Sequence, residues 1–172
     1  FLRLEFSKLI EKLGLSAPGV SPAEASAPAA CARETVTERA RMEELLALWR
    51  ERSHVSLVAL PDRNAVCVEW GEPEHSRTAL FCADRLESYN DFLRGLFAPD
   101  IPKVAHNVKD LMRGLLEEGL PIGGFVFDTA LAAYLLSPTD GSYELEKLGM
   151  TYYNQEFPKA AAYLEEGAFG PL

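Results

Sequence analysis

The sequence predicts a single α/β domain in which a mixed sheet of about five strands is flanked by helices. Two observations lead to this fold class. Three short apolar segments between residues 54 and 82 are separated by turn residues, as in a β-meander. After residue 86, segments with helical periodicity alternate with short strand candidates. A length of 172 residues is sufficient for one such domain with a full hydrophobic core.

The first 33 residues divide into a helix and a linker. A helix is predicted over Phe1–Leu15, with Gly14 as its stop. Its apolar residues recur at helical spacing: Leu2, Phe6, Leu9, Ile10 and Leu13. Residues 16–33 are rich in Ala, Pro and Ser without periodicity, which is typical of a flexible linker. The helix either belongs to a preceding domain or packs back onto the main one, which is expected over residues 34–172.

The first half of the main domain is predicted as one helix and three strands. The helix covers Thr37–Arg52, with Thr37 as its N-cap. One face of this helix is apolar: Met42, Leu45, Leu46 and Trp49. The strands cover His54–Leu60, Ala65–Trp70 and Thr78–Cys82. Trp49 and Trp70 both lie on apolar periodicities, so we expect them in the core.

The second half alternates helices with short strands. Helices are predicted over Leu86–Leu96, Asn107–Glu118, Thr129–Leu136 and Glu144–Gly149, and strands over Lys103–Ala105 and Phe125–Phe127. Gly119 ends the second of these helices. Asp128, directly before an apolar helix, is interpreted as its N-cap.

Composition limits the classes of function. The net charge of −9, with 26 acidic against 17 basic residues, predicts weak nucleic-acid affinity for the chain by itself. The three cysteines are widely spaced and lack metal-ligand spacing, which argues against a zinc site and favours a reducing compartment. His54 and His75 also lack partners at a recognisable spacing. No apolar run approaches the roughly 20 residues of a membrane span, so no membrane partner is expected.

The segment Lys103–Leu136 carries three motifs in a fixed order. They are His106-Asn107-Val108-Lys109 after a strand, Phe127-Asp128-Thr129 at the end of the next strand, and Tyr134-Leu135-Leu136 closing an apolar helix. In this order they resemble the proofreading 3′–5′ exonuclease domain of bacterial, family A DNA polymerase I. The resemblance spans roughly Val36–Phe157 and implies the ribonuclease-H-like 3′–5′ exonuclease fold. Residues 1–15 also resemble the junction between the 5′-nuclease and exonuclease domains of such polymerases.

The resemblance implies a two-metal site built from four acids. Active relatives carry an Asp-x-Glu pair on the first strand, an Asp in the helix after the Asn-containing turn, and a late Asp four residues after a Tyr. Here Val58, Leu60 and Leu111 fill the first three positions. At the late spacing, Tyr152, Tyr153 and Tyr163 are followed by Glu156, Phe157 and Gly167. The resemblance therefore implies a catalytically degenerate member with no catalytic residue and no metal ligand, whose former cleft has become packing.

Asp110 is the obvious substitute for the missing acid, because it adjoins Leu111. Successive helical residues are about 100° apart. An apolar stripe contains Leu111 but not Asp110: Val108, Leu111, Met112, Leu115 and Leu116. Asp110 is therefore interpreted as a surface acid. Two alternatives stay open: an active exonuclease with an unusual site made of Asp62, Asp110, Asp128 and Glu156, and a non-enzymatic interaction module of the same fold.

The resemblance also implies nucleic-acid contacts at His106 and Asn107, where active relatives contact the single strand. Lys109 is a further candidate for a phosphate contact. The alternative, purely structural interpretation is that His106 and Asn107 shape a turn and cap a helix, and that Lys109 is a surface lysine.

The resulting functional hypothesis is a vestigial proofreading domain without a cofactor of its own. Its parent chain is expected to be a cytoplasmic, monomeric DNA-directed DNA polymerase that uses Mg²⁺. DNA would be bound through that parent, and the neighbours of this domain would be the polymerase and 5′-nuclease domains. The first residue is Phe rather than Met, as expected of a fragment.

Overall fold

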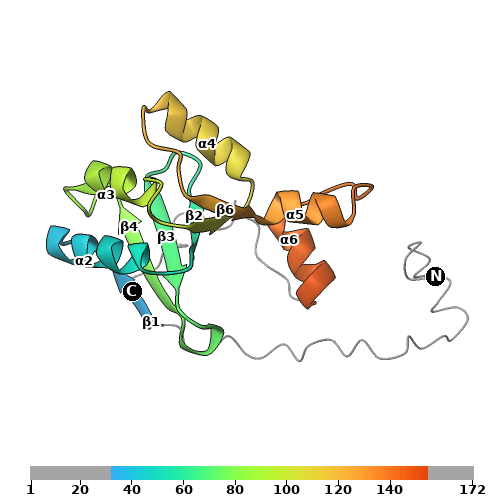
Figure 1. Cartoon of the computed structure of the whole chain (residues 1–172), viewed down its shortest axis with the longest axis horizontal. Helices are drawn as coiled ribbons and strands as arrows, with labels where there is room; N and C mark the ends of the chain where they lie inside the picture. Colours follow the sequence, from blue (N-terminus) through green and yellow to red (C-terminus); the bar gives the residue numbers. More distant parts are fainter. Residues whose placement is uncertain (1–31, 155–172) are drawn as a thin grey trace, which may run out of the picture.

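A computed structural model describes residues 32–154 of the chain. The predicted helix over residues 1–15, the linker up to residue 31 and the tail from residue 155, with Glu156 and Tyr163, lie outside the described residues. The described part is a six-stranded mixed sheet in the order β1-β4-β3-β2-β5-β6, flanked by helices (Figure 1). The fold class predicted from the sequence is thus confirmed, with one strand more than expected.

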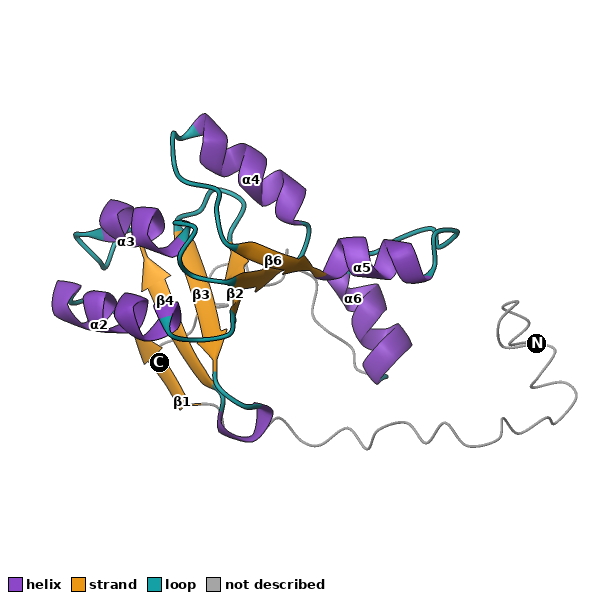
Figure 2. Cartoon of the chain, in the orientation of Figure 1, coloured by secondary structure: helices purple, strands orange, loops and turns teal. Residues whose placement is uncertain are grey.

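The strands are β1 (Ala32–Thr35), β2 (Val55–Ala59), β3 (Ala65–Trp70), β4 (Arg77–Cys82), β5 (Lys103–Ala105) and β6 (Phe125–Asp128). The α-helices are α2 (Arg39–Arg50), α3 (Tyr89–Leu96), α4 (Val108–Glu117), α5 (Thr129–Leu136) and α6 (Leu145–Leu148). A 3₁₀ turn, η2 (Pro73–His75), precedes β4, and a π-helical turn, η3 (Gly149–Tyr153), follows α6. Figure 2 shows α5 and α6 projecting past the β6 edge of the sheet.

The sheet combines two pairing modes. Strands β2, β3 and β4 form the predicted antiparallel meander, with Val58 opposite Cys67 and Val68 opposite Ala79. Strands β5 and β6 continue the sheet parallel to β2, as β-α-β connections require. The remaining strand, β1, pairs in parallel with β4.

Two expectations at the start of the domain were wrong. Ala32 and Arg33 were assigned to the linker but belong to β1, whose polar sequence lacks the strand alternation. Thr37 does not cap the first helix: α2 begins at Arg39, and Glu38 stands at the N-cap without a side-chain hydrogen bond. The reason is that the extended chain continues past β1, since the Val36 amide donates to the Leu80 carbonyl at 2.9 Å.

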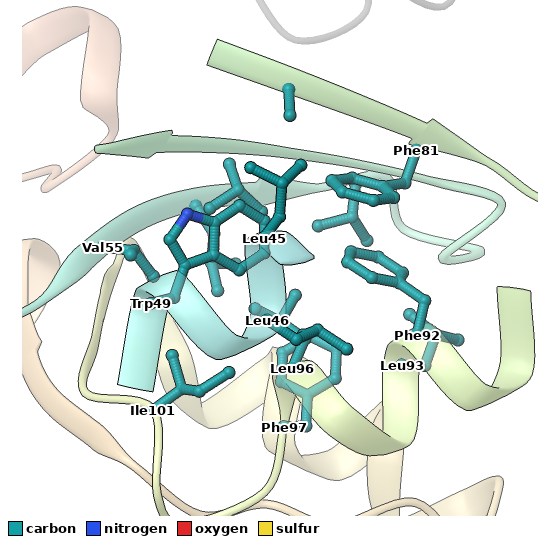
Figure 3. Packing of buried hydrophobic residues seen from close by; sticks show 14 of the residues in the cluster. Leu45, Leu46, Trp49, Val55, Phe81, Phe92, Leu93, Leu96, Phe97 and Ile101 are labelled. Atoms are coloured by element: carbon teal, nitrogen blue, oxygen red, sulfur yellow. The ribbon is translucent and has the colours of Figure 1, made fainter. Parts of the chain in front are cut away.

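The hydrophobic core lies between one face of the sheet and helices α2 and α3 (Figure 3). Trp49 of α2 contacts Trp70 and Phe81 edge-on, with ring centroids 5.4 and 5.9 Å apart. The Phe81 ring stacks on Phe92 of α3 at 3.8 Å. Both tryptophans are buried, so their prediction as core residues is confirmed.

Lys103 in β5 is completely buried, which the sequence did not predict. Its ammonium group donates to the carbonyls of Ala98 at 3.0 Å and Ile101 at 2.6 Å. It also lies 5.5 Å from the centroid of the Phe125 ring. Burial lowers the pKa of Lys103 to about 8, and the nearby Asp100 carboxylate opposes that shift. Lys103 therefore ties the α3–β5 loop to the parallel strands β5 and β6.

The last third of the described chain buries little apolar surface. In α5 only Ala133 is buried, and α6 contains no buried residue. Most of the exposed large apolar side chains follow residue 115: Leu116, Val126, Phe127, Leu131, Tyr134, Leu135, Leu136, Leu145, Met150, Tyr152 and Tyr153. None of the described helices is long and apolar enough to cross a bilayer.

Candidate functional site

The candidate site lies where two helices start beside each other at the sheet edge. Ala105, the last residue of β5, pairs with Asp128, the last residue of β6. Because the strands are parallel, α4 and α5 begin at the same end of the sheet. The two predicted motifs, around Asn107 and around Asp128, are therefore neighbours in space.

The Asp128 carboxylate accepts hydrogen bonds from the first turns of both helices. For α5, the amides of Ala130 and Leu131 donate to Oδ1 at 2.9 and 3.4 Å. For α4, the Asn107 amide donates to Oδ1 at 3.1 Å and the Val108 amide to Oδ2 at 2.9 Å. Asp128 is thus the N-cap of α5, as its position in the sequence predicts, and it also caps α4. The second role crosses 20 residues of sequence, so no local pattern could reveal it.

His106 and Asn107 form the turn that leads into α4. Asn107 has a left-handed backbone with φ of 53°, a conformation that Asn tolerates better than most residues. Its side-chain amide donates to Asp110 Oδ2 at 2.7 Å. His106 Nδ1 lies 2.8 Å from Thr129 Oγ1, so this half-buried ring is also held by the α5 junction. Of the three candidates for nucleic-acid contact, Asn107 and Lys109 are exposed.

The apolar stripe of α4 is narrower than the sequence predicted. Val108 and Leu115 are buried, and Leu111 and Met112 are partly buried against the core. Leu116, which was assigned to the stripe, is 59% exposed. It lies about 100° from Leu115 around the helix axis, beyond the face that meets the sheet.

The position of Asp110 agrees with its interpretation as a surface acid. Its side chain is 63% exposed, whereas the adjacent Leu111 packs against the core. Asp110 forms an exposed ion pair with Arg113, with 4.0 Å between Asp110 Oδ1 and the guanidinium.

The two positions that the resemblance assigns to the Asp-x-Glu pair, Val58 and Leu60, are not core positions. Val58 of β2 is 63% exposed, because Val55 and Leu57 occupy the face that packs against the helices. Leu60 follows the end of β2 and is half-buried. The expectation that all three apolar replacements extend the core is therefore wrong for Val58. Among the three, only Leu111 packs against the core cluster.

The described residues do not fit a two-metal carboxylate site. Within residues 32–154, no three His, Cys, Asp or Glu side chains gather as metal ligands would. Asp62 accepts from the backbone and side chain of Asn64 in a turn. The Asp128 carboxylate accepts four backbone amides, three at Oδ1 and one at Oδ2, so its hydrogen bonds hold the two helix starts. Glu156, the fourth acid of the alternative site, lies outside the described residues.

A groove lies beside the candidate site, between α4 and β6, and is called here the α4–β6 groove. Its volume is about 720 Å³. Its apolar lining comes from both elements and their neighbours: Val108, Met112, Leu116, Ile122, Phe125, Val126, Phe127 and Leu131. Lys109, Arg113 and Glu117 of α4 and Asp128 supply its charged groups.

Comparison with known proteins shows short but clear sequence similarity to one enzyme. The chain is 43% identical over 58 residues to DNA polymerase I of Mycobacterium leprae, and 38% identical over 58 residues to that of Mycobacterium tuberculosis. In both cases the alignment covers 34% of this chain and 6% of the relative. The matched region is thus a small part of those proteins. No protein-family model matches the chain.

Solved structures extend the similarity over most of the chain. The POL domain of Pol1 from M. smegmatis, in complex with DNA primer-template and dNTP, has a TM-score of 0.59 and 25% identity. That match covers 72% of this chain and 23% of the other. Escherichia coli RNase D, an exoribonuclease, has a TM-score of 0.56 and 17% identity, covering 76% of this chain and 36% of its own.

The catalytic core of RRP6 from Trypanosoma brucei has the same fold. Its TM-score is 0.59 at 15% identity, with 94% of this chain and 46% of that chain covered. Identities this low establish the fold alone. The fold is the ribonuclease-H-like 3′–5′ exonuclease fold, and the short sequence matches support the resemblance to the exonuclease domain of DNA polymerase I.

Proposed function

We propose that this chain is a degenerate 3′–5′ exonuclease domain of a bacterial DNA polymerase I, and that it acts as a structural scaffold without proofreading. In this proposal the parent chain is a Mg²⁺-dependent, DNA-directed DNA polymerase. DNA is bound through the parent, and this domain lies between its polymerase and 5′-nuclease domains.

The observation that carries the proposal is the arrangement on α4. Leu111, at the family acid position, packs against the core, while Asp110 points to solvent and accepts from Asn107. Bringing Asp110 to the position of Leu111 would need a rotation of the helix by about 100°, which would expose Val108 and Leu115. Burial of those two side chains opposes such a rotation.

The hydrogen bonds of Asp128 give further support to the proposal. Its carboxylate holds the starts of two helices, with three backbone amides donating to Oδ1 and one to Oδ2. Loss of a helix cap destabilises a protein by roughly 0.5–2 kcal/mol, so recruitment of Asp128 would weaken both helix starts. Its role in the proposal is structural.

The absence of proofreading is tested by incubating the chain with 5′-labelled single-stranded DNA and either Mg²⁺ or Mn²⁺. We expect no metal-dependent shortening from the 3′ end above the protein-free control. An active 3′–5′ exonuclease serves as the positive control. Trimming that is metal-dependent and disappears in Asp62→Ala or Asp110→Ala variants would overturn the inactive assignment in favour of a non-standard site.

The assignment to a polymerase is tested separately. Full-length natural protein containing this domain should extend a primer on a template when it is supplied with deoxynucleoside triphosphates and Mg²⁺. A full-length protein that lacks this activity would refute the polymerase parent and favour an interaction module of the same fold.

A further inference from the structure

We infer that two copies of this chain associate through their α4–β6 grooves, with the two α4 helices antiparallel across a two-fold axis. The inference concerns the 172-residue chain and does not depend on the proposed polymerase parent. For this chain it departs from the monomeric state expected of the parent.

The groove is an apolar surface that the described residues leave uncovered. Three of its apolar side chains remain largely exposed: Leu116 at 59%, Val126 at 59% and Leu131 at 57%. They come from α4, β6 and α5, and β6 is the last strand of the described sheet. A second molecule can therefore approach this surface from beyond the sheet edge. A contiguous exposed apolar surface with charged groups at its rim is typical of an interaction site.

The two ends of the groove carry opposite charges. At the start of α4, the Val108 amide donates to Asp128, so this end of the helix lies close to Leu131 at the start of α5. Lys109 lines the groove at that end. Glu117 lines it at the other end of α4, eight residues later and about 12 Å along the helix axis.

A surface with this arrangement of charges is complementary to itself. In a two-fold dimer the same surface of both copies forms the contact, and two antiparallel helices meet start to end. With the axis midway along α4, Lys109 of each copy lies opposite Glu117 of the other. Leu116 of each copy then lies near Leu131 of the other. Two ion pairs and two apolar contacts therefore form together.

The remaining charges are compatible with this contact. Arg113 is the midpoint between Lys109 and Glu117, so the two Arg113 side chains meet at the axis. Each of them keeps a counter-ion on its own helix, because Asp110 Oδ1 lies 4.0 Å from the guanidinium. The net charge of −9 on each copy opposes association, but at physiological salt charges more than about 8 Å apart are largely screened.

A second copy is the occupant that these charges favour. A different protein would need an anion and a cation at matching positions, whereas a second copy supplies both by symmetry. Two-fold dimers are also the most frequent assemblies of soluble proteins. Because the groove is only one part of one face, we expect a weak dimer with a micromolar dissociation constant.

The contact is tested by analytical ultracentrifugation of the 172-residue chain from low to high micromolar concentration at physiological salt. We expect a monomer–dimer equilibrium. Leu116→Asp should shift it to the monomer, because a charge would enter the apolar part of the contact. The matched control is Leu48→Asp, the same change at a leucine of α2 that is 37% exposed, and it should leave the equilibrium unchanged.

The antiparallel register is tested by exchanging charges. Lys109→Glu and Glu117→Lys should each weaken the dimer by about 2- to 30-fold, because each change removes two exposed ion pairs from the symmetric dimer. An equimolar mixture of the two variants should regain the affinity of the natural chain. In the mixed dimer, both glutamates of one variant lie opposite both lysines of the other.

Four results would overturn the inference. A monomer at every concentration would reject the dimer itself. An equal effect of Leu116→Asp and Leu48→Asp would place the contact outside the groove. A mixture no stronger than the single variants would reject the antiparallel register. A mass that grows beyond the dimer with concentration would indicate an open contact instead of a two-fold one.

Discussion

At the scale of single residues, Asp128 is the side chain on which the candidate site depends most. Its two oxygens accept four backbone amides, two from the start of each helix. Asp128→Ala should lower the free energy of unfolding by about 2 kcal/mol, because two caps worth about 1 kcal/mol each are lost. The measurement is urea denaturation followed by tryptophan fluorescence, since Trp49 and Trp70 are both in the core.

The control for that substitution is Asp110→Ala. Asp110 is mostly exposed and accepts one hydrogen bond from Asn107, so its loss should change stability by no more than about 0.5 kcal/mol. Equal losses for the two variants would mean that the double cap contributes no special stability.

Because Lys103 is buried, the stability of the folded chain should increase as the pH rises above 8. Its pKa is about 8 in the folded protein, compared with an ordinary value of 10.5. Between these values the unfolded chain binds the proton more strongly, so the unfolding free energy should rise with pH. Below pH 8 both states are protonated, and burial of the ammonium group penalises folding in full. The rise is at most about 3 kcal/mol, from roughly 1.4 kcal/mol for each pKa unit.

The contribution of Lys103 is isolated by comparison with Lys103→Met, which keeps the apolar stem. The unfolding free energy of the natural chain, relative to this variant, should stay constant below pH 8 and increase from pH 8 to 10.5. A difference that is flat over that range would show that the amine does not titrate there.

Of the environments of individual residues, the sequence predicted that of Leu111 correctly but not those of Val58 and Lys103. Leu111 was expected to pack, and it does, because helical periodicity fixes the face of a residue on its helix. Val58 was also expected to pack but is exposed, because strand alternation places its neighbours Val55 and Leu57 on the covered face. The burial of Lys103 depends on carbonyls of a loop, and no periodicity reports them.

At the scale of elements, one arginine joins the β2–β3 turn to the end of α4. Arg63, in the β2–β3 turn, forms an ion pair with Glu118 at the end of α4, and its Nε donates to Oε1 at 3.0 Å. This interaction lowers the pKa of Glu118 and raises that of Arg63. The guanidinium lies against Gly114, where a β-carbon would overlap it. The β2–β3 turn therefore packs closely against α4, with the Arg63 side chain in the space that a larger residue at position 114 would need.

This contact predicts that the effect of Gly114→Ala on stability depends on whether Arg63 is present. Alanine normally stabilises a helix interior by about 1 kcal/mol relative to glycine. In the natural chain that gain should be absent, because the new methyl group displaces the Arg63 side chain. In an Arg63→Ala background the gain should reappear. Thermal denaturation of the four proteins in this cycle measures it, and an equal gain in both backgrounds would contradict the proposed contact.

The elements that the sequence predicted well are those with strong local patterns. Strands β3 and β5 and helix α5 have the predicted bounds, and α4 differs by one residue at each end. Strand β1 was missed because its only signal is backbone pairing with β4, which is distant in sequence. The Thr37 cap was wrong for the same reason, since that pairing keeps the chain extended through Val36.

At the scale of the whole molecule, the net charge of −9 sets the expected behaviour toward DNA. The dissociation constant for single-stranded DNA at physiological salt should be no tighter than the roughly 1–100 μM of non-specific binding. Fluorescence anisotropy with a labelled oligonucleotide at 50 and 200 mM salt provides the measurement. Nanomolar affinity that falls steeply with salt would contradict the expectation.

A His106→Ala and Lys109→Ala double variant addresses two of the three candidates for nucleic-acid contact. If those residues only shape the turn and the surface, the weak affinity should stay unchanged. A further loss of binding would identify the start of α4 as a remaining DNA contact.

Because the amine of Lys103 is completely buried, its chemical modification can be used to measure local opening of the structure around β5. Amine-reactive acylating reagents should modify the exposed Lys109 and Lys147 rapidly and spare Lys103 in the closed state. Modification of Lys103 would then proceed only as fast as the α3–β5 loop separates from β5 and β6. A mass-spectrometric time course at saturating reagent would thus give the opening rate of this part of the sheet, with two lysines of the same chain as internal standards.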